Sequence, residues 1–166
     1  MKICILATGP SMSQALADSL RGENCIVVNN AYMLAPWAIA LAAQDHAWWM
    51  ANPEAMRFAG RKFSTNKIEG VERVHSDFVI RASSSGVLAL EVARRLGGRR
   101  IELHGFDNRG THYFGPHPSP LRNTSVARFG VFEQQFAALG AEMKKAGIRI
   151  INKTPNSALR CFEMAA

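Results

Sequence analysis

Short apolar segments of strand length alternate along the chain with segments of helical periodicity. The apolar runs Lys2–Leu6 and Cys25–Val28 predict two buried strands, and residues 37–43 predict a third, although the alanines in this run fit a helix equally well. Residues 11–20 predict a helix that starts at Ser11, because the S-x-x-Q spacing there is that of a capping box. This alternation is typical of a mainly parallel sheet built from βα units.

The rest of the chain continues the same alternation. The middle of the chain predicts a short helix at residues 53–59 and three short strands, at Arg61–Ser64, at 73–75 and near Val79. The second half predicts a helix at residues 85–96 with a strand at 99–104, and then a helix along the Phe129, Phe132 and Phe136 stripe with a strand at 148–151. A closing helix is predicted at 157–162. We therefore expect one three-layer, Rossmann-like α/β domain over residues 1–166, with a mostly parallel twisted sheet.

Composition narrows the class of protein. The chain has 166 residues, of which 48% are hydrophobic, as is usual for a globular domain. Its apolar runs are shorter than the roughly 20 residues of a membrane span, and the N-terminal run is too short for a signal peptide. We therefore expect a cytoplasmic protein. The net charge of +7 favours a nucleotide, a phosphorylated substrate or a nucleic acid as partner, although a basic protein without any such partner fits equally well.

The cysteines do not suggest a metal or disulfide framework. Cys4, Cys25 and Cys161 are odd in number and lack metal-ligand spacing. The first two lie in apolar runs, where cysteine usually acts as a small buried hydrophobe. We expect neither a disulfide framework nor a zinc site.

Small and hydrogen-bonding residues follow nearly every predicted strand. In open α/β sheets, ligands bind outside the carboxyl ends of the strands. The residues in these positions are Thr8, Gly9, Pro10, Ser11, Asn29, Asn30, Asp45, Ser84, Ser85, Gly86 and Asp107. The helices that start at Ser11 and at Ser84-Ser85 would direct free N–H groups toward this edge. The alternatives stay open: the serines cap their own helices, and the asparagines serve turns.

The loop at residues 105–124 carries most of the reactive side chains. His112 and His117 titrate near neutral pH, Tyr113 can donate a hydrogen bond to a phosphate, and Arg109 and Arg122 can neutralise one. Long loops in compact domains are commonly functional. The alternative is that both histidines are ordinary exposed loop residues.

The segments "ILATGPSM", "VVNNAY" and "SSGVLALEVARRLGGRRIELHGFD" together resemble bacterial sialyltransferases and their relatives. These relatives include motility accessory factors and 6-hydroxymethylpterin diphosphokinases, and the "HYFGPHP" loop is similar to small bacteriophage-encoded members. The ending "INKTPNSALRCF" also resembles the closing strand of this group. The chain departs from the group's G-x-G-P-S turn, since Ala7 and Thr8 replace its first two positions. It is also shorter than a typical sialyltransferase.

The resemblance implies a nucleotide site. It assigns the nucleotide cradle to Gly9–Ser11, a contact to Asn29 or Asn30, and a phosphate-facing helix start to Ser84–Gly86. It also implies a histidine base, His112 or His117, with Tyr113 near the leaving phosphate. The function this favours is a glycosyltransferase that uses a nucleotide-sugar donor of CMP type.

Two other functions remain. An ATP- and Mg²⁺-dependent diphosphokinase would use Asp45 and Asp107 as its carboxylates. A non-catalytic protein that binds nucleotides or nucleic acid would use the positive charge, and its binding would depend strongly on salt.

Overall fold

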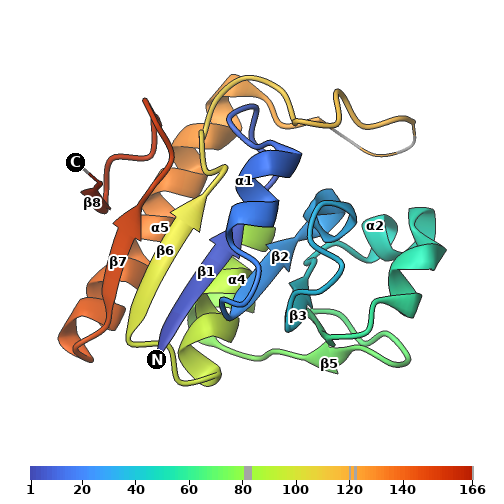
Figure 1. Ribbon diagram of the computed structural model, residues 1–166, viewed down its shortest axis with the longest axis horizontal. Helices are drawn as coiled ribbons and strands as arrows, with labels where there is room; N and C mark the ends of the chain where they lie inside the picture. The colour runs from blue at the N-terminus through green and yellow to red at the C-terminus, as the bar shows by residue number, and fades with distance from the viewer. Residues whose placement is uncertain (81–83, 120, 122, 166) are drawn as a thin grey trace.

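Eight parallel strands form one sheet in the order β5-β4-β3-β2-β1-β6-β7-β8 (Figure 1). This is a computed structural model, and it describes residues 1–80, 84–119, 121 and 123–165. The strands are β1 (Lys2–Leu6), β2 (Cys25–Val28), β3 (Ala40–Ala42), β4 (Arg61–Ser64), β5 (Glu72–Arg73), β6 (Arg100–His104), β7 (Arg149–Asn152) and β8 (Glu163–Met164). The helices are α1 (Gln14–Ser19), α2 (His46–Ala51), α3 (Asp77–Ile80), α4 (Ser85–Arg95) and α5 (Val126–Lys145), with 3-10 helices η1 (Asn29–Met33) and η2 (Pro53–Arg57).

Helices cover both faces of this sheet, which confirms the predicted three-layer α/β fold. Figure 1 shows α1 in front of the sheet, with α4 and α5 behind it. Alternate side chains of β1 point to opposite faces: Ile3 and Ile5 pack with α4 and α5, while Cys4 and Leu6 pack on the side of α1 and the tryptophans of α2. Burial on both faces explains why β1 and β2 are nearly continuous apolar runs.

Helix α4 is the most deeply buried helix of the described chain. Residues 85–93 are all buried, because the sheet, α3 and α5 surround them. One charged side chain, Glu91, lies in this stretch, and it is 1% exposed. Arg94 and Arg95, in the last turn, both donate hydrogen bonds to its carboxylate, and Arg94 is bidentate at 2.9 and 2.7 Å.

The structure corrects four of the predicted elements. Helix α1 begins at Gln14 and is capped by Ser13, whose hydroxyl accepts from Leu16 N, so the capping box at Ser11 was wrong. Strand β3 is shorter than predicted, at Ala40–Ala42. Residues near Val79 form the short helix α3 in place of a strand. Residues 157–162 are not helical, and the chain continues from them into β8.

Candidate functional site

A cavity of about 410 Å³ lies at the carboxyl-terminal edge of the sheet. The turn after β1, the start of η1, the start of α4 and the β6–α5 loop form its walls. Figure 1 shows this loop crossing above the carboxyl ends of the strands. The predicted residues that line the cavity are Thr8, Gly9, Asn29, Asp45, Ser84, Ser85, Gly86, Asp107, Arg109, His112 and His117. The fold thus brings together residues from across the sequence.

Hydrogen bonds join the turn after β1 to the loop after β6. The Ser11 hydroxyl donates to Asp107 Oδ2 at 2.8 Å, and the Ser11 backbone N–H lies 3.3 Å from the same oxygen. Gly9 N donates to the carbonyl of Gly105 at 2.9 Å. A Cβ on Gly9 would lie 2.0 Å from Asp107 Oδ2 and 2.4 Å from Gly105 O. The close approach of these two loops therefore requires glycine at position 9 whether or not a nucleotide binds there.

Both serines at the start of α4 have structural partners. Ser84 is the N-cap, and its hydroxyl accepts from Gly86 N at 3.2 Å. The Ser85 hydroxyl accepts from Gln44 N at 3.0 Å, which ties α4 to the segment after β3. A Cβ on Gly86 would lie 2.9 Å from the rings of both Phe106 and Phe136. These residues position the N-terminus of α4 against the cavity, where its dipole favours an anion.

The two asparagines after β2 have different surroundings. Asn29 lines the cavity with a φ of 48°, a left-handed conformation that asparagine adopts more readily than most residues. Its side-chain Oδ1 is buried and, within the described part of the chain, has no hydrogen-bond partner. Asn30 Oδ1 instead accepts from Trp48 Nε1 at 2.7 Å. Of the two asparagines, Asn29 therefore lines the cavity and Asn30 does not.

Two imidazoles stand side by side at the mouth of the cavity. The rings of His112 and His117 have centroids 4.4 Å apart, and Thr8 Oγ1 lies 2.8 Å from His112 Nδ1. Burial, reinforced by the charge of His117, lowers the pKa of His112 to about 4. Burial also lowers the pKa of His117, but the negative charge of Asp45 opposes that effect. His112 is thus neutral at physiological pH, and the charge of Asp45 acts on His117.

Asp45 and Arg109 supply charge at the cavity. Loss of solvent contact raises the pKa of the Asp45 carboxyl, and the charges of Arg128 and His117 counter this. Arg128 also lies over the ring of Phe132, 5.8 Å from its centroid. Arg109 lines the cavity wall as expected. Arg122, the other predicted arginine, lies outside the described residues.

One side of the cavity is apolar, which the sequence interpretation missed. Phe129, Phe132 and Phe136 of α5 line it together with Leu159. The three-four stripe of α5 was assigned to the core, yet its first two phenylalanines are only half-buried and Phe136 alone of the three is fully buried. The first phenylalanines of α5 come directly after the polar β6–α5 loop, whose residues line the same cavity. That neighbouring polar loop was the sequence signal that this end of the stripe forms a cavity wall.

Some predicted residues do not face the cavity. The side chain of Ser11 binds Asp107, and that of Asn30 binds Trp48. Pro10 is exposed and outside the cavity lining. Tyr113 is 41% exposed and its ring packs edge-on against Phe114, so it does not contribute to the lining. The structure gives these four residues no direct place around a ligand in the cavity.

Neither the protein-family models nor the curated proteins include a match to this chain. None of the helices among the described residues combines the length and hydrophobicity that crossing a bilayer requires.

Proposed function

We propose that this chain is a nucleotide-binding transferase that moves a sugar from a nucleotide-sugar donor to an acceptor hydroxyl. One observation carries the proposal: a single cavity at the carboxyl edge of a parallel sheet is lined by the start of α4, Asn29, Asp45 and His117. Such edges are where open α/β sheets bind ligands. The volume of about 410 Å³ falls within the range of small-molecule sites.

The walls of the cavity suit the parts of such a donor. The N-terminus of the eleven-residue helix α4 would bind the phosphate, because its free N–H groups and dipole favour an anion. Asn29 Oδ1, buried and without a partner among the described atoms, would accept a hydrogen bond from the base or ribose. The phenylalanines of α5 would cover an apolar face of the ligand. The resemblance to sialyltransferases favours a CMP-type donor.

His117 is the better of the two imidazoles for a general base. A base works best when its pKa lies near the working pH, and the pKa of His112, at about 4, is too low for that. Asp45 counteracts the lowering of the His117 pKa and would stabilise the imidazolium that forms. The acceptor oxygen would bond to the anomeric carbon, its proton would pass to His117, and the bond from that carbon to the phosphate oxygen would break. The leaving phosphate would remain at α4.

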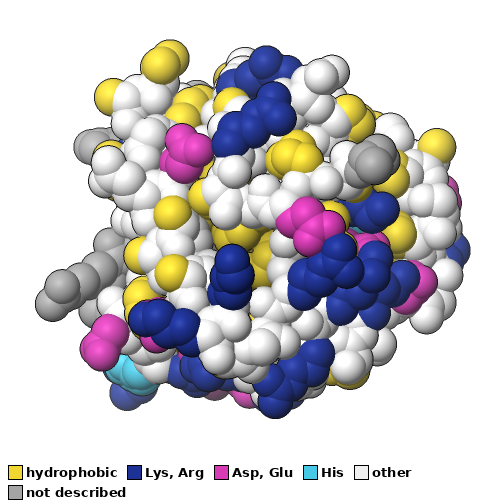
Figure 2. Space-filling model, turned by 90° about the vertical axis from the view of Figure 1, so that its left-hand side faces the viewer, with side chains coloured by type: hydrophobic (Ala, Val, Ile, Leu, Met, Phe, Trp, Pro, Cys, Tyr) yellow, Lys and Arg dark blue, Asp and Glu magenta, His cyan; other side chains and the backbone are white. Residues whose placement is uncertain are grey.

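A thermal-shift panel tests the binding part of the proposal. We expect CMP to raise the melting temperature more than UMP, ADP, ATP or a pterin. A rise with ATP that requires Mg²⁺, with release of AMP on turnover, would assign a diphosphokinase instead. Binding to random DNA that falls steeply with salt, with no response to nucleotides, would select the nucleic-acid reading. The basic side chains are the feature that bears on this nucleic-acid alternative. On the face toward β7 and β8, Figure 2 shows them in several separate groups, with acidic side chains beside them.

Histidine variants test the catalytic part. His117→Asn should lower turnover by about 10²–10⁴-fold while it preserves the thermal shift with nucleotide. His46→Asn is the matched control, because His46 is an exposed histidine at the start of α2 that lies outside the cavity lining. Full activity of His117→Asn would exclude His117 as the base, and loss of the nucleotide shift in the same variant would place it in binding instead.

A further inference from the structure

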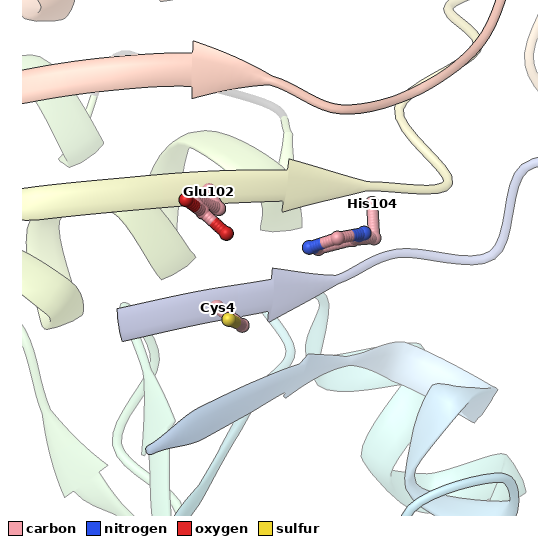
Figure 3. Close-up of side chains that lie close together, drawn as sticks. All are labelled: Cys4, Glu102 and His104. Atoms are coloured by element: carbon pink, nitrogen blue, oxygen red, sulfur yellow. The ribbon is translucent and has the colours of Figure 1, made fainter. Parts of the chain in front are cut away.

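Three side chains with metal-ligand chemistry meet on the sheet, apart from the cavity. Cys4 on β1 pairs in register with Glu102 on β6, and His104 follows two residues later on the same face of β6. Figure 3 shows the imidazole of His104 and the carboxylate of Glu102 converging beside the thiol of Cys4. Their ligand atoms all lie within 4.8 Å of one another. The side chains come from positions almost a hundred residues apart, which explains why no spacing motif indicates them.

The three side chains are buried, and one nitrogen of His104 has no hydrogen bond of ordinary geometry among the described residues. Cys4 is 0% exposed, Glu102 is 6% exposed and His104 is 7% exposed. The Nε2 atom of His104 is buried and makes no hydrogen bond of ordinary geometry to a described residue, and the Cys4 thiol is the side chain that interacts with this imidazole. Buried polar atoms in proteins nearly always have a partner, so an unsatisfied imidazole nitrogen that faces a thiol and a carboxylate indicates a missing ligand.

We propose that Cys4, Glu102 and His104 bind a transition-metal ion of the Zn²⁺ class. Thiolate sulfur, imidazole nitrogen and carboxylate oxygen are the ligands that Zn²⁺ takes in proteins, whereas Mg²⁺ and Ca²⁺ prefer oxygen alone. Tetrahedral bonding at these bond lengths places ligand atoms about 3.5 Å apart, which small side-chain rotations reach from the observed spacing. The Cys4 thiolate and the Glu102 carboxylate supply two negative charges at the site, and Arg100 shares that of Glu102. The fourth position would take a water molecule.

The surroundings of Glu102 fit the same role. Arg100 donates both of its hydrogen bonds to Oε1, at 2.9 and 2.6 Å, so Oε2 lies outside this ion pair. Partners of this kind orient metal-ligating carboxylates. The charges of Lys2 and Lys153 also act on this carboxylate. The ion would cross-link β1 to β6 directly below the two loops that Ser11 and Asp107 join.

Cobalt titration tests this site by spectroscopy. The reduced, EDTA-treated full chain is titrated with Co²⁺ alone under anaerobic conditions. We expect one equivalent to produce a thiolate-to-cobalt charge-transfer band in the near ultraviolet and the visible bands of tetrahedral Co²⁺, and Zn²⁺ to abolish both. Zn²⁺ at a hundredfold excess over its dissociation constant should also raise the melting temperature by about 5–10 °C.

The cysteine content allows a control that keeps all three proposed ligands, although it replaces the Cys25 thiol that lies beside Cys4 on β2. The chain has three cysteines, so the double variant Cys25→Ser/Cys161→Ser retains Cys4 alone. Its charge-transfer band should persist, and His104→Gln should weaken Co²⁺ binding by more than about tenfold. Cys4→Ser should abolish the charge-transfer band. Absence of the band from the double variant, or an unchanged affinity in a folded His104→Gln protein, would overturn the proposal. Nucleotide binding plays no part in these measurements.

Discussion

Replacing Gly9 by alanine should destabilise the protein because the turn after β1 has no room for a Cβ atom. The added carbon would lie 2.0 Å from the Asp107 carboxylate and 2.4 Å from the Gly105 carbonyl oxygen. Gly9 is not among the residues with a positive φ, so alanine can adopt its backbone conformation and the cost is steric. The carboxylate cannot simply rotate away, since Ser11 holds the same oxygen through its hydroxyl and its N–H.

The magnitude follows from the contacts that must give way. Overpacking of this kind costs about 1–3 kcal/mol. Moving the loop also weakens the Ser11–Asp107 hydrogen bond, which is worth about 1.5–3 kcal/mol because the acceptor is a carboxylate. Since these contributions overlap, we expect Gly9→Ala to lower the free energy of unfolding by about 3–4 kcal/mol. For a chain of this length the melting temperature should then fall by about 6–16 °C.

Urea unfolding followed by circular dichroism measures this change, with Gly130→Ala as the matched control. Gly130 lies in α5, and no atom lies within 4 Å of a Cβ built on it. Alanine there should be neutral or stabilising by up to about 1 kcal/mol, because alanine favours helix. A Gly9→Ala protein within about 0.5 kcal/mol of the wild type would refute the steric argument. The measurement contains no nucleotide, so it separates the structural role of Gly9 from a role in binding.

Two further predictions concern buried charge and pH. Burial raises the pKa of Glu91, but hydrogen bonds from Arg94 and Arg95 outweigh it and hold this pKa below 4.5. Glu91→Gln should therefore lower the free energy of unfolding, measured with urea at pH 7, by about 1–2 kcal/mol. The difference in this free energy from the wild type should shrink as the pH falls below 4.5. An unchanged difference at acid pH would contradict the prediction. The pKa of His112 falls from 6.5 to about 4 on folding, so the unfolded chain takes up the proton first and stability should decline as the pH drops from 6.5 to 4. His112→Asn should flatten that decline, and an NMR titration midpoint near 6.5 for this histidine would contradict the prediction.

Four of the strands could be predicted from the sequence almost to the residue. Lys2–Leu6, Cys25–Val28 and Arg61–Ser64 have the predicted boundaries, and β6 starts one residue later than expected. The first two strands are buried along nearly their whole length, so their position in the core is encoded in local hydrophobicity alone. The positions that follow strands could be predicted for the same reason, because parallel strands end at one edge.

Elements that depend on distant partners could not be predicted in this way. The S-x-x-Q pattern at Ser11 is a local signal for a cap, but the hydroxyl binds Asp107, 96 residues away. The segment that was predicted as a closing helix is likewise held by distant contacts. Ser157 donates to the carbonyl of Phe106 at 2.5 Å and accepts from Asn152 Nδ2 at 3.0 Å. These side-chain hydrogen bonds take the place of the backbone hydrogen bonds that a helix would form.

The same distinction, between features encoded locally and features that depend on distant partners, separates the cavity from the proposed metal site. The polar residues that line the cavity follow strand ends or lie in the β6–α5 loop, and their positions in the sequence identified them, although only the structure tells Asn29 from Asn30. The phenylalanines of α5 were instead assigned to the core. Cys4, Glu102 and His104 lie inside strands that the sequence predicts, but the pairing of β1 with β6 alone brings them together. A buried glutamate and a buried histidine at alternate positions of an apolar strand were the local signal, because such side chains are costly to bury without a partner. In parallel α/β folds, polar residues within a strand therefore merit the same attention as those that follow it.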